Sequence, residues 1–364
     1  MWGDKHVDIF ELVGLAAEKG ASDLHLVTDN APIFRINGLL QPEASLPALT
    51  PDDITQAFQQ ITPEKERADF HQRLELDFGY TLPDVGRLRC NAARQRGNII
   101  LTIRLIPLVI PTLEELGLPA ICRDLIIKPR GLVVVSGPSG SGKSTTLAAM
   151  INYLNSAENR RVITLEDPIE YVYANNKCVI TQRELGGDTL SFADALKHIL
   201  RQDPDVILVG EMRDLETAAA VLTVAETGHL VLTTGHATSA PQAVERIIDL
   251  FPTHERHLAQ TRLASLLIGI LCQTLVPRLD GAGRVAAVEV MLALPSVKNI
   301  IREGRIHQLP NAIVTQAQSG MMLLDHALIN LYRSGAISGD SLFSVCNDRE
   351  EVAKLVGQTK VKEL

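Results

Sequence analysis

The stretch LVVVSGPSGSGKST, residues 132–145, determines how the rest of this chain is interpreted. LVVVS is a continuous apolar run of the kind that forms a strand buried on both faces, and the KSTTLAAMINYLN that begins at Lys143 is an amphipathic helical pattern. Between them, every fixed position of G-x-x-x-x-G-K-[S/T] is filled, by Gly137, Gly142, Lys143 and Ser144. The order strand, glycine loop, helix is the context that this pattern requires. It predicts a loop that binds the phosphates of a nucleoside triphosphate.

The residue types of the loop suit that ligand. Its glycines allow backbone N–H groups to turn toward a phosphate, which the N-terminus of the following helix also favours. Lys143 is expected to neutralise the outer phosphates, and the Ser144 hydroxyl to meet Mg²⁺.

Two further apolar runs end in carboxylates. ILVGEMRD places Glu211 at the carboxyl edge of the predicted sheet, and TLEDPIEY places Glu166, Asp167 and Glu170 near the same edge. One acidic residue after a strand is as often a solvated loop residue as a functional one. Two such strand ends converging on a phosphate loop favour a role in binding the metal or activating water.

Histidines flank a fourth apolar strand. TGHLVLTTGHATSA contains His229 before the strand and His236 at its end. A lone histidine at a strand terminus is more often structural than catalytic. The neighbouring site makes His236 a candidate donor to a γ-phosphate.

Arginines gather near residue 100. GRLRCNAARQRG and LTIRLIP carry five of them, at Arg87, Arg89, Arg94, Arg96 and Arg104. They form either a solvated sheet face or a source of positive charge for phosphoryl transfer. The sequence leaves open which domain or subunit they face.

The chain of 364 residues is long enough for two domains. Residues 1–106 alternate short helices and strands, with a hairpin signal at Asn37-Gly38 and a helix start at Thr50-Pro51, and predict a small α+β domain. Residues 107–119 contain three prolines and are predicted to be the linker.

From residue 120 to 364 strand and helix patterns alternate, as in a doubly wound α/β fold, and the final part is mostly helical. The apolar stretch LASLLIGILCQTLV, residues 263–276, is short for a membrane span and contains Gln273 and Thr274. We expect a buried helix there.

Composition narrows the functional classes. A net charge of -8 provides no global positive field for nucleic acid or anionic lipid, and 4% aromatic residues leave few platforms for stacking bases. The first residues lack the pattern of a secretory signal, and no transmembrane segment is expected. The cysteines are scattered, without a C-x-x-C pair, so disulfides and a zinc site are not expected either. These features predict a cytoplasmic protein.

Five ordered segments carry a resemblance: GPSGSGKSTTLAAMINYLN, TLEDPIEY, ILVGEMRD, TGHLVLTTGHATSA and SVKNIIREGRIHQL. Together they resemble the PilT family of type IV pilus retraction ATPases, within the secretion ATPase superfamily. GASDLHL and LTIRLIP extend the resemblance over nearly the whole chain. It implies a PAS-like N-terminal domain and a RecA-like motor domain that bind ATP and Mg²⁺ between them.

The same resemblance implies partners and a location. The family forms ring-shaped homohexamers that act on an inner-membrane platform protein and, through it, on the pilin fibre. The protein is then expected at the inner face of the cytoplasmic membrane, with no nucleic-acid partner.

Site roles are carried over position by position. The resemblance makes Glu166 the water-activating base and Glu211 the Mg²⁺ partner, largely through water, although the reverse assignment stays open. Lys143, His236, Arg89 and Arg104 complete the implied catalytic set. Ser144 is the second implied metal contact. The implied nucleotide contacts are Gly137, Pro138, Ser139, Gly140, Ser141, Gly142, Lys143, Ser144, Thr145, Asp167, His229, Arg94 and Arg96.

The chain departs from the family pattern in two places. The His box usually has Leu before its second histidine and Asn two residues after it, whereas this chain has Gly235 and Thr238. The segment usually written AIRNLIRE reads SVKNIIRE here, so Lys298 replaces an arginine to which it is not chemically equivalent.

Alternatives remain at this point. An accessory, PilU-like pilus ATPase or a related secretion or DNA-transport motor would share the motifs. A non-hydrolysing regulator is disfavoured by the intact Glu166, Glu211 and His236, and a GTPase by NNKC, which lacks the aspartate that reads guanine. The additional N-terminal region and the tetracysteine zinc site of assembly and type II secretion relatives have no counterpart in this sequence, which favours retraction.

Overall fold

The computed structural model describes residues 8–36, 38–83, 85–106, 109–281 and 283–357. These residues form two compact units. The first runs to Val109 and also includes Glu170–Val172, and the second comprises Ile110–Ile169 and the chain from Tyr173 onward.

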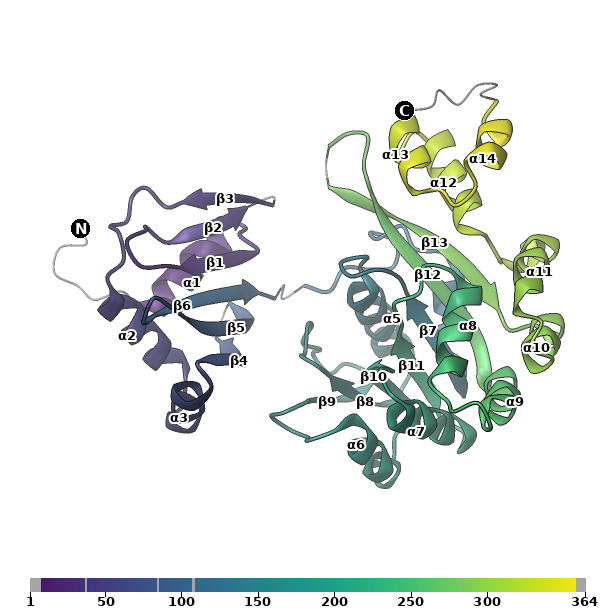
Figure 1. Cartoon of the computed structure of the whole chain (residues 1–364), viewed down its shortest axis with the longest axis horizontal. Helices are drawn as coiled ribbons and strands as arrows, with labels where there is room; N and C mark the ends of the chain where they lie inside the picture. Colours follow the sequence, from purple (N-terminus) through teal and green to yellow (C-terminus); the bar gives the residue numbers. More distant parts are fainter. Residues whose placement is uncertain (1–7, 37, 84, 107–108, 282, 358–364) are drawn as a thin grey trace. The chain divides into compact units, whose positions relative to one another are not determined.

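The first unit is built on a six-stranded antiparallel sheet with the order β3-β2-β1-β6-β5-β4 (Figure 1). Its hairpin between β2 and β3 pairs Ile36 with Leu39, which leaves two connecting residues, as Asn37-Gly38 predicts. Asn37 itself lies outside the described residues, and Gly38 has a φ of +83°, a conformation that glycine adopts readily. The strands are β1 (Asp23–Leu26), β2 (Ile33–Ile36), β3 (Leu39–Pro42), β4 (Glu75–Leu82), β5 (Gly86–Gln95) and β6 (Asn98–Leu105).

Three helices cover one face of this sheet, namely α1 (Ile9–Glu18), α2 (Pro51–Ile61) and α3 (Glu64–Arg73). Thr50 and Asp53 form a reciprocal capping box at the start of α2, which confirms the predicted helix start. Aromatic rings fill the space between helices and sheet, since the ring centroid of Phe58 lies 4.9 Å from that of Phe70 and 6.3 Å from that of Phe78. The predicted α+β class of this unit is confirmed.

The second unit contains a seven-stranded sheet with the order β13-β12-β7-β11-β10-β8-β9. Its strands are parallel except for β13, which pairs antiparallel with β12 at one edge. This doubly wound sheet confirms the expected RecA-like class. The strands are β7 (Gly131–Ser136), β8 (Arg161–Glu166), β9 (Val179–Glu184), β10 (Val206–Glu211), β11 (Leu230–Thr234), β12 (Leu267–Pro277) and β13 (Arg284–Leu292).

The prediction of a helix over residues 263–276 is wrong for most of this range. Helix α9 ends at Leu266, and Leu267–Pro277 form strand β12, hydrogen-bonded to β7 on one side and β13 on the other. An apolar run that is buried on all sides has no periodicity to separate strand from helix, so the pairing partners decide.

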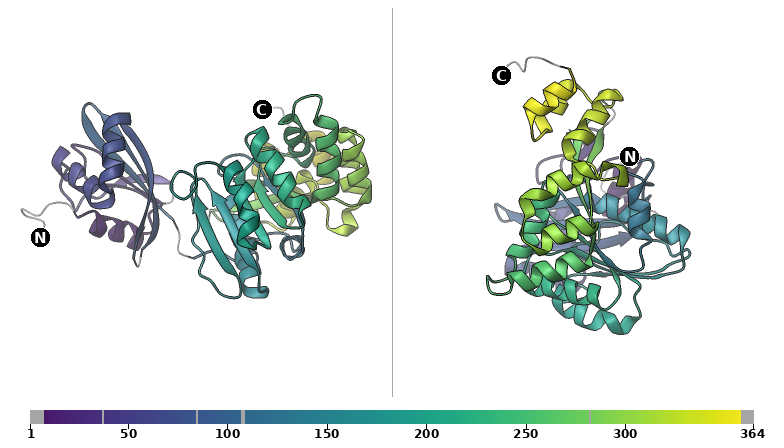
Figure 2. Two further views of the ribbon diagram at one scale, coloured as in Figure 1. Left: turned by 90° about the horizontal axis from the view of Figure 1, so that it is seen from below. Right: turned by 90° about the vertical axis from the view of Figure 1, so that its right-hand side faces the viewer.

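Helices cover both faces of the sheet (Figure 2). Alternate residues of each strand point to opposite faces. One set packs with α4 and α5, and the other with α6 to α11. These helices are α4 (Ile121–Ile126), α5 (Lys143–Ala157), α6 (Phe192–Ile199), α7 (Leu215–Glu226), α8 (Ala240–Asp249), α9 (Arg256–Leu266), α10 (Pro295–Arg302) and α11 (Leu309–Thr315).

Three further helices pack together against the ends of β12 and β13, as the mostly helical final part predicts. They are α12 (Leu324–Arg333), α13 (Gly339–Val345) and α14 (Arg349–Leu355). Among the residues that the structure describes, none of the helices combines the length and apolar character needed to cross a bilayer.

The predicted linker, residues 107–119, begins at Pro107 and Leu108, which lie outside the described residues. From Ile110 onward the segment belongs to the second unit. Leu113 is buried there in the same cluster as Cys122 and Leu125.

The aromatic cluster of the first unit generates a stability prediction. Phe58→Ala removes a side chain that is 1% exposed and leaves a cavity beside Phe70, so we expect the unit to lose about 3–5 kcal/mol of unfolding free energy. Chemical denaturation followed by circular dichroism measures this loss. Leu39→Ala, at a side chain that is 68% exposed, is the matched control and should cost under about 0.5 kcal/mol. Equal losses in the two variants would contradict the packing described here.

Candidate nucleotide-binding site

Four neighbouring parallel strands bring the predicted site residues to one edge of the second sheet. In sheet order, β7 leads into the glycine loop, β11 ends before His236, β10 ends at Glu211 and β8 ends at Glu166. Because all four strands run in the same direction, their carboxyl ends share that edge. The sequence predicted that two strand ends meet at the phosphate loop, and the structure brings four strand ends to this edge.

The glycine loop has a backbone that other residues could not adopt without strain. Gly137 has a φ of +146°, and a Cβ there would stand 2.2 Å from the carbonyl oxygen of Gln273. Gly142 has a φ of +87° and forms the N-cap of α5. The ammonium of Lys143 donates to the carbonyl oxygens of Gly137 (2.9 Å) and Pro138 (3.1 Å), so its charge lies over the loop. A phosphate in the loop would meet this charge together with the N-terminus of α5.

A buried glutamine on β12 forms hydrogen bonds with the glycine loop and with the helix that follows it. Gln273 Nε2 donates to the carbonyl oxygen of Ser141 (2.7 Å), and its Oε1 accepts from the hydroxyl of Thr146 (2.7 Å). Gln273 is 3% exposed, and the two contacts join the loop to the first turn of α5. In the sequence, Gln273 is a polar interruption of an apolar run, from which no role was predicted. A polar residue within a buried apolar run indicates a side chain that forms hydrogen bonds in the interior.

One atom of the loop shows that it suits an anionic ligand. The Ser141 hydroxyl oxygen is buried without a hydrogen-bond partner among the described atoms. An unpaired polar group in a glycine loop at a helix N-terminus fits a phosphate oxygen, which it could reach as a donor. The loop residues, with Ser144 at the first turn of α5, thus fit both a triphosphate and the Mg²⁺ that accompanies it.

Glu211 is the centre of a small charged group. Its Oε2 lies 3.1 Å from Nε2 of His236, and because a carboxylate only accepts, that nitrogen carries the proton. The other oxygen pairs with Arg213, two residues further along the chain. The hydrogen bond from Arg213 to Glu211 raises the pKa of the arginine, and the nearby charge of Asp167 adds to this. Arg213 belongs to the EMRD motif, and the sequence predicted no role for it.

Glu166 is oriented by neutral donors instead. Its Oε1 accepts from the hydroxyl of Thr164 (2.6 Å) and from Nε2 of Gln182 (3.1 Å). Gln182 lies on β9, an edge strand that the sequence analysis did not predict. At this edge Glu211 therefore contacts Arg213 and His236, and Glu166 contacts a hydroxyl and an amide.

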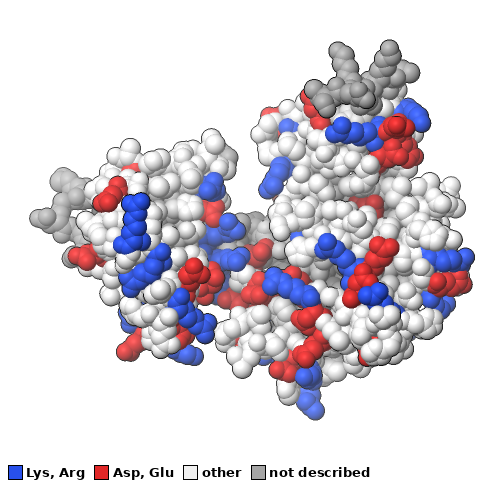
Figure 3. All heavy atoms as spheres, viewed as in Figure 1, with Lys and Arg blue, Asp and Glu red and all other residues white. Residues whose placement is uncertain are grey.

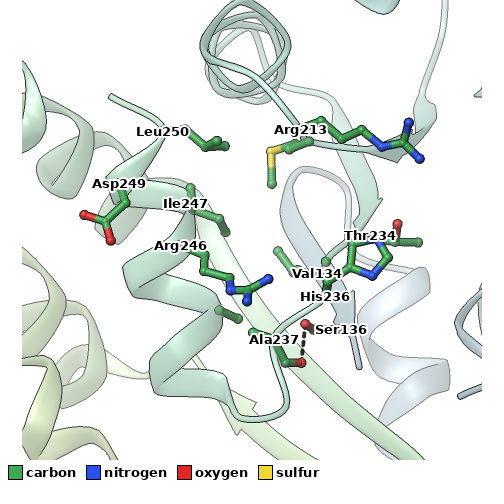
Figure 4. A pocket seen from close by; sticks show the side chains of 13 residues that line it. Val134, Ser136, Arg213, Thr234, His236, Ala237, Arg246, Ile247, Asp249 and Leu250 are labelled. Carbon is green, nitrogen blue, oxygen red and sulfur yellow. Dashed lines mark hydrogen bonds between the residues drawn. The ribbon is translucent and has the colours of Figure 1, made fainter. Parts of the chain in front are cut away.

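A cavity of about 330 Å³ lies beside the His236 loop (Figure 4). In the close-up the guanidinium of Arg246, from α8, points into it on the side of Ser136 and His236, while Asp249 points away. The Ser136 hydroxyl donates to the carbonyl oxygen of Ala237 (2.7 Å), which ties the last residue of β7 to this loop. A second cavity of about 640 Å³ is lined by Asp167, Glu211 and the first turns of α6 and α7.

The glycine that departs from the His-box pattern has a packing reason. A Cβ on Gly235 would lie 3.0 Å from the Ser136 hydroxyl oxygen, so a leucine here would have to displace Ser136. The other departure at this loop, Thr238, donates through its hydroxyl to Oε1 of Gln242 (2.9 Å). Lys298, the departure in α10, donates to the carbonyl oxygen of Ser265 (3.1 Å) near the end of α9.

His229 lies at the opposite edge of the sheet from His236. It directly precedes β11, its carbonyl oxygen accepts from Gly131 at the start of β7, and its Nδ1 lies 2.9 Å from the Thr227 hydroxyl. A five-residue strand separates the two histidines by about 17 Å. Within the chain, the implied nucleotide contact of His229 is therefore not among the side chains that this edge brings together.

The four implied arginines of the first unit fall into two groups. Arg89 and Arg104 are cross-strand neighbours on the sheet face that the helices leave uncovered, and Arg104 donates to the buried Asp23 (2.8 Å). Hydrogen bonds from Ser22 and Arg104 outweigh the effect of burial and lower the pKa of Asp23. Arg94 instead lies over the Phe70 ring, at 5.5 Å from its centroid, and Arg96 occupies the turn between β5 and β6. The structure does not bring all four together.

Taken together, the doubly wound sheet and the groups at its carboxyl edge define a RecA-like P-loop ATPase. A family model described as type II/IV secretion system protein matches residues 109–325. The chain is 44% identical over 335 residues to the type IV pilus retraction ATPase PilT of Pseudomonas aeruginosa, covering 92% of this chain and 97% of that protein. It is 40% identical to the type IV pilus ATPase PilU of the same organism, covering 95% and 90%.

A solved structure agrees with these relatives. The crystal structure of the pilus retraction motor PilT with bound ADP superposes with a TM-score of 0.89 at 40% identity, covering 96% of this chain and 99% of that one. This chain therefore belongs to the PilT family of ATPases, within the type II/IV secretion system proteins.

The role of Gln273 can be tested by an isosteric apolar replacement. Gln273→Leu leaves the Ser141 carbonyl and the Thr146 hydroxyl without their buried partner, so the loop loses its support and nucleotide affinity should fall roughly tenfold. Titration with a fluorescent ADP analogue measures the dissociation constant. Gln59→Leu, at an exposed position of α2, should leave affinity unchanged. A folded Gln273→Leu protein that binds ADP as tightly as the wild type would refute this role.

Proposed function

We propose that this protein is an ATP-hydrolysing motor that drives retraction of type IV pili. The observation that carries the proposal is the shared edge of β7, β11, β10 and β8, where one lysine, two carboxylates and one histidine lie within a chain of the PilT family. The relatives of that name are a retraction ATPase and a retraction motor.

Each side chain has a task in phosphoryl transfer. Lys143 and the loop N–H groups hold the outer phosphates, and Glu166, oriented by Thr164 and Gln182, takes the proton of the attacking water. His236, whose Nε2–H points to Glu211 here, would donate to the γ-phosphate by turning that N–H from Glu211 to the nucleotide. Ser144 and Glu211 would hold Mg²⁺, which supplies neutralising charge when bound.

The arginines of the first unit are proposed as additional sources of positive charge. Arg89 is exposed, whereas Arg104 already pairs with Asp23, so we assign direct phosphate contact to Arg89 and a supporting position to Arg104. The assignment of Arg94 and Arg96 to the same phosphate is weakened by their place at the other end of β5. Assembly as a homohexamer at the inner face of the cytoplasmic membrane, acting on a platform protein and through it on the pilin fibre, completes the proposal.

Two other functions have less support. An accessory role like that of PilU is compatible with 40% identity, but the match to PilT is stronger at 44%. A DNA motor would need a basic groove, whereas acidic and basic side chains lie interspersed on the face of each unit seen in Figure 3.

The catalytic assignment predicts two different kinetic defects. Glu166→Gln keeps the shape of the side chain but removes the base, so kcat should fall by about 10²–10⁴-fold with ATP affinity nearly unchanged. Lys143→Ala should weaken ATP binding itself, because it removes the charge over the loop. Steady-state phosphate release and equilibrium ATP binding separate the two effects. Glu350→Gln, an exposed position in α14, is the control. A wild-type protein as inert as both variants would exclude the motor.

The direction of the motor is tested in cells. Deletion of the gene should give cells with excess surface pili and no twitching, and Glu166→Gln should not restore movement. Pili are counted by electron microscopy and movement by a stab assay. Cells without pili would indicate assembly instead of retraction.

A further inference from the structure

Glu289 is a carboxylate buried in the middle of β13, opposite Cys272 of β12. It is 2% exposed, and among the described residues it forms no ion pair with a lysine, arginine or histidine. Two backbone N–H groups donate to it instead, that of Ala240 to Oε1 (2.6 Å) and that of Leu324 to Oε2 (3.2 Å).

Both donors are first residues of helices. Ala240 begins α8 and Leu324 begins α12. The first N–H groups of a helix have no intrahelical acceptor, and they carry the positive end of the helix dipole. The N-cap residue of α12, Leu323, has no side chain that could accept a hydrogen bond. Glu289, on strand β13, accepts it instead. One carboxylate thus caps two helices.

On one side of Glu289 lies the catalytic edge. Ala240 follows His236 by four residues, and the carbonyl oxygen of Ala237 between them accepts from Ser136, the residue before the glycine loop. A displacement of the His236 loop therefore shifts the start of α8 and one oxygen of Glu289.

On the other side lie the final helices. Met322 exchanges two backbone hydrogen bonds with Val290 on β13, which fixes the approach to α12. Asp325, in the first turn of α12, accepts from the N–H groups of Asn347 and Asp348, and Asp348 is the N-cap of α14. The hydrogen bonds are continuous from β7 to α14.

We propose that Glu289 is a positioning residue that couples the nucleotide-dependent state of the His236 loop to helices α12 and α14. The carboxylate is planar and rigid, so its two oxygens cannot follow the two helix starts independently. The inference rests on the proposed function of the nucleotide site and extends it to a route by which that site controls the carboxyl-terminal helices.

The chemistry of Glu289 indicates that it does more than occupy space in the core. Burial raises the pKa of Glu289, which means that ionising this side chain in its buried position costs free energy. An apolar side chain of similar volume would often stabilise such a position at least as well. What an apolar side chain cannot do is accept from both helix starts at once.

Hydrogen exchange of the full-length protein, with and without a non-hydrolysable ATP analogue, tests the coupling. In the wild type, the analogue should change the exchange rates of 236–242 and also of 324–330, the latter by roughly tenfold if one capping hydrogen bond is made or lost. In Glu289→Gln, which keeps the shape but not two equivalent acceptors, the response of 236–242 should persist. The response of 324–330 should fall below about twofold.

A second pair of variants isolates the donor. Leu324→Pro and Leu324→Ala both lose a buried side chain, but only proline also loses the N–H that donates to Glu289, and proline is tolerated at the first helical position. The response of 324–330 should therefore be lost in the proline variant and retained in the alanine variant. Glu245→Gln, exposed on α8, controls for a change of charge.

The outcomes separate this inference from the proposed function. If wild-type protein hydrolyses ATP and 324–330 respond equally in wild type and Glu289→Gln, the coupling is refuted while the motor stands. The same holds if 324–330 do not respond in the wild type. If the wild type neither hydrolyses ATP nor responds at 236–242, both proposals fail.

Discussion

The common direction of β7, β11, β10 and β8 is the constraint on which the site depends. Parallel strands place all their carboxyl ends at one edge, so segments as far apart in the chain as those of Lys143 and His236 end at the same edge. The hydrogen-bonded ladder that fixes this direction is buried between two layers of helices, where an unpaired backbone group would be costly.

Strand β12, which lies on the other side of β7, supports the glycine loop. Gln273 of β12 and Glu289 of the neighbouring β13 are polar although both strands are buried. Gln273 supports the glycine loop, and Cys272 pairs in register with Glu289, which caps α8 and α12. Polar groups at such depth persist only when each atom is satisfied, and here the partners are the loop and helix starts that a motor would have to move.

Charge at the edge is divided between two environments. Glu211 pairs with Arg213 and accepts a hydrogen bond from His236, while Glu166 accepts hydrogen bonds from Thr164 and Gln182. The motifs alone leave open which of the two carboxylates is the base, and the proposed function assigns that role to Glu166.

Local signals in the sequence were sufficient for the glycine loop, the capping box at Thr50, the hairpin at Asn37-Gly38 and both fold classes, because each depends on residues close together in the chain. The sequence also indicates that His229 and His236 lie at opposite ends of one strand, because the first precedes that strand and the second follows it. Only the tertiary structure decided that Leu267–Pro277 is a strand, that Gln273 supports the loop and that Glu289 joins two helices. The reason is physical: an apolar run takes its conformation from whichever strands it pairs with, and the partner of a buried polar atom is set by distant segments that the sequence does not place.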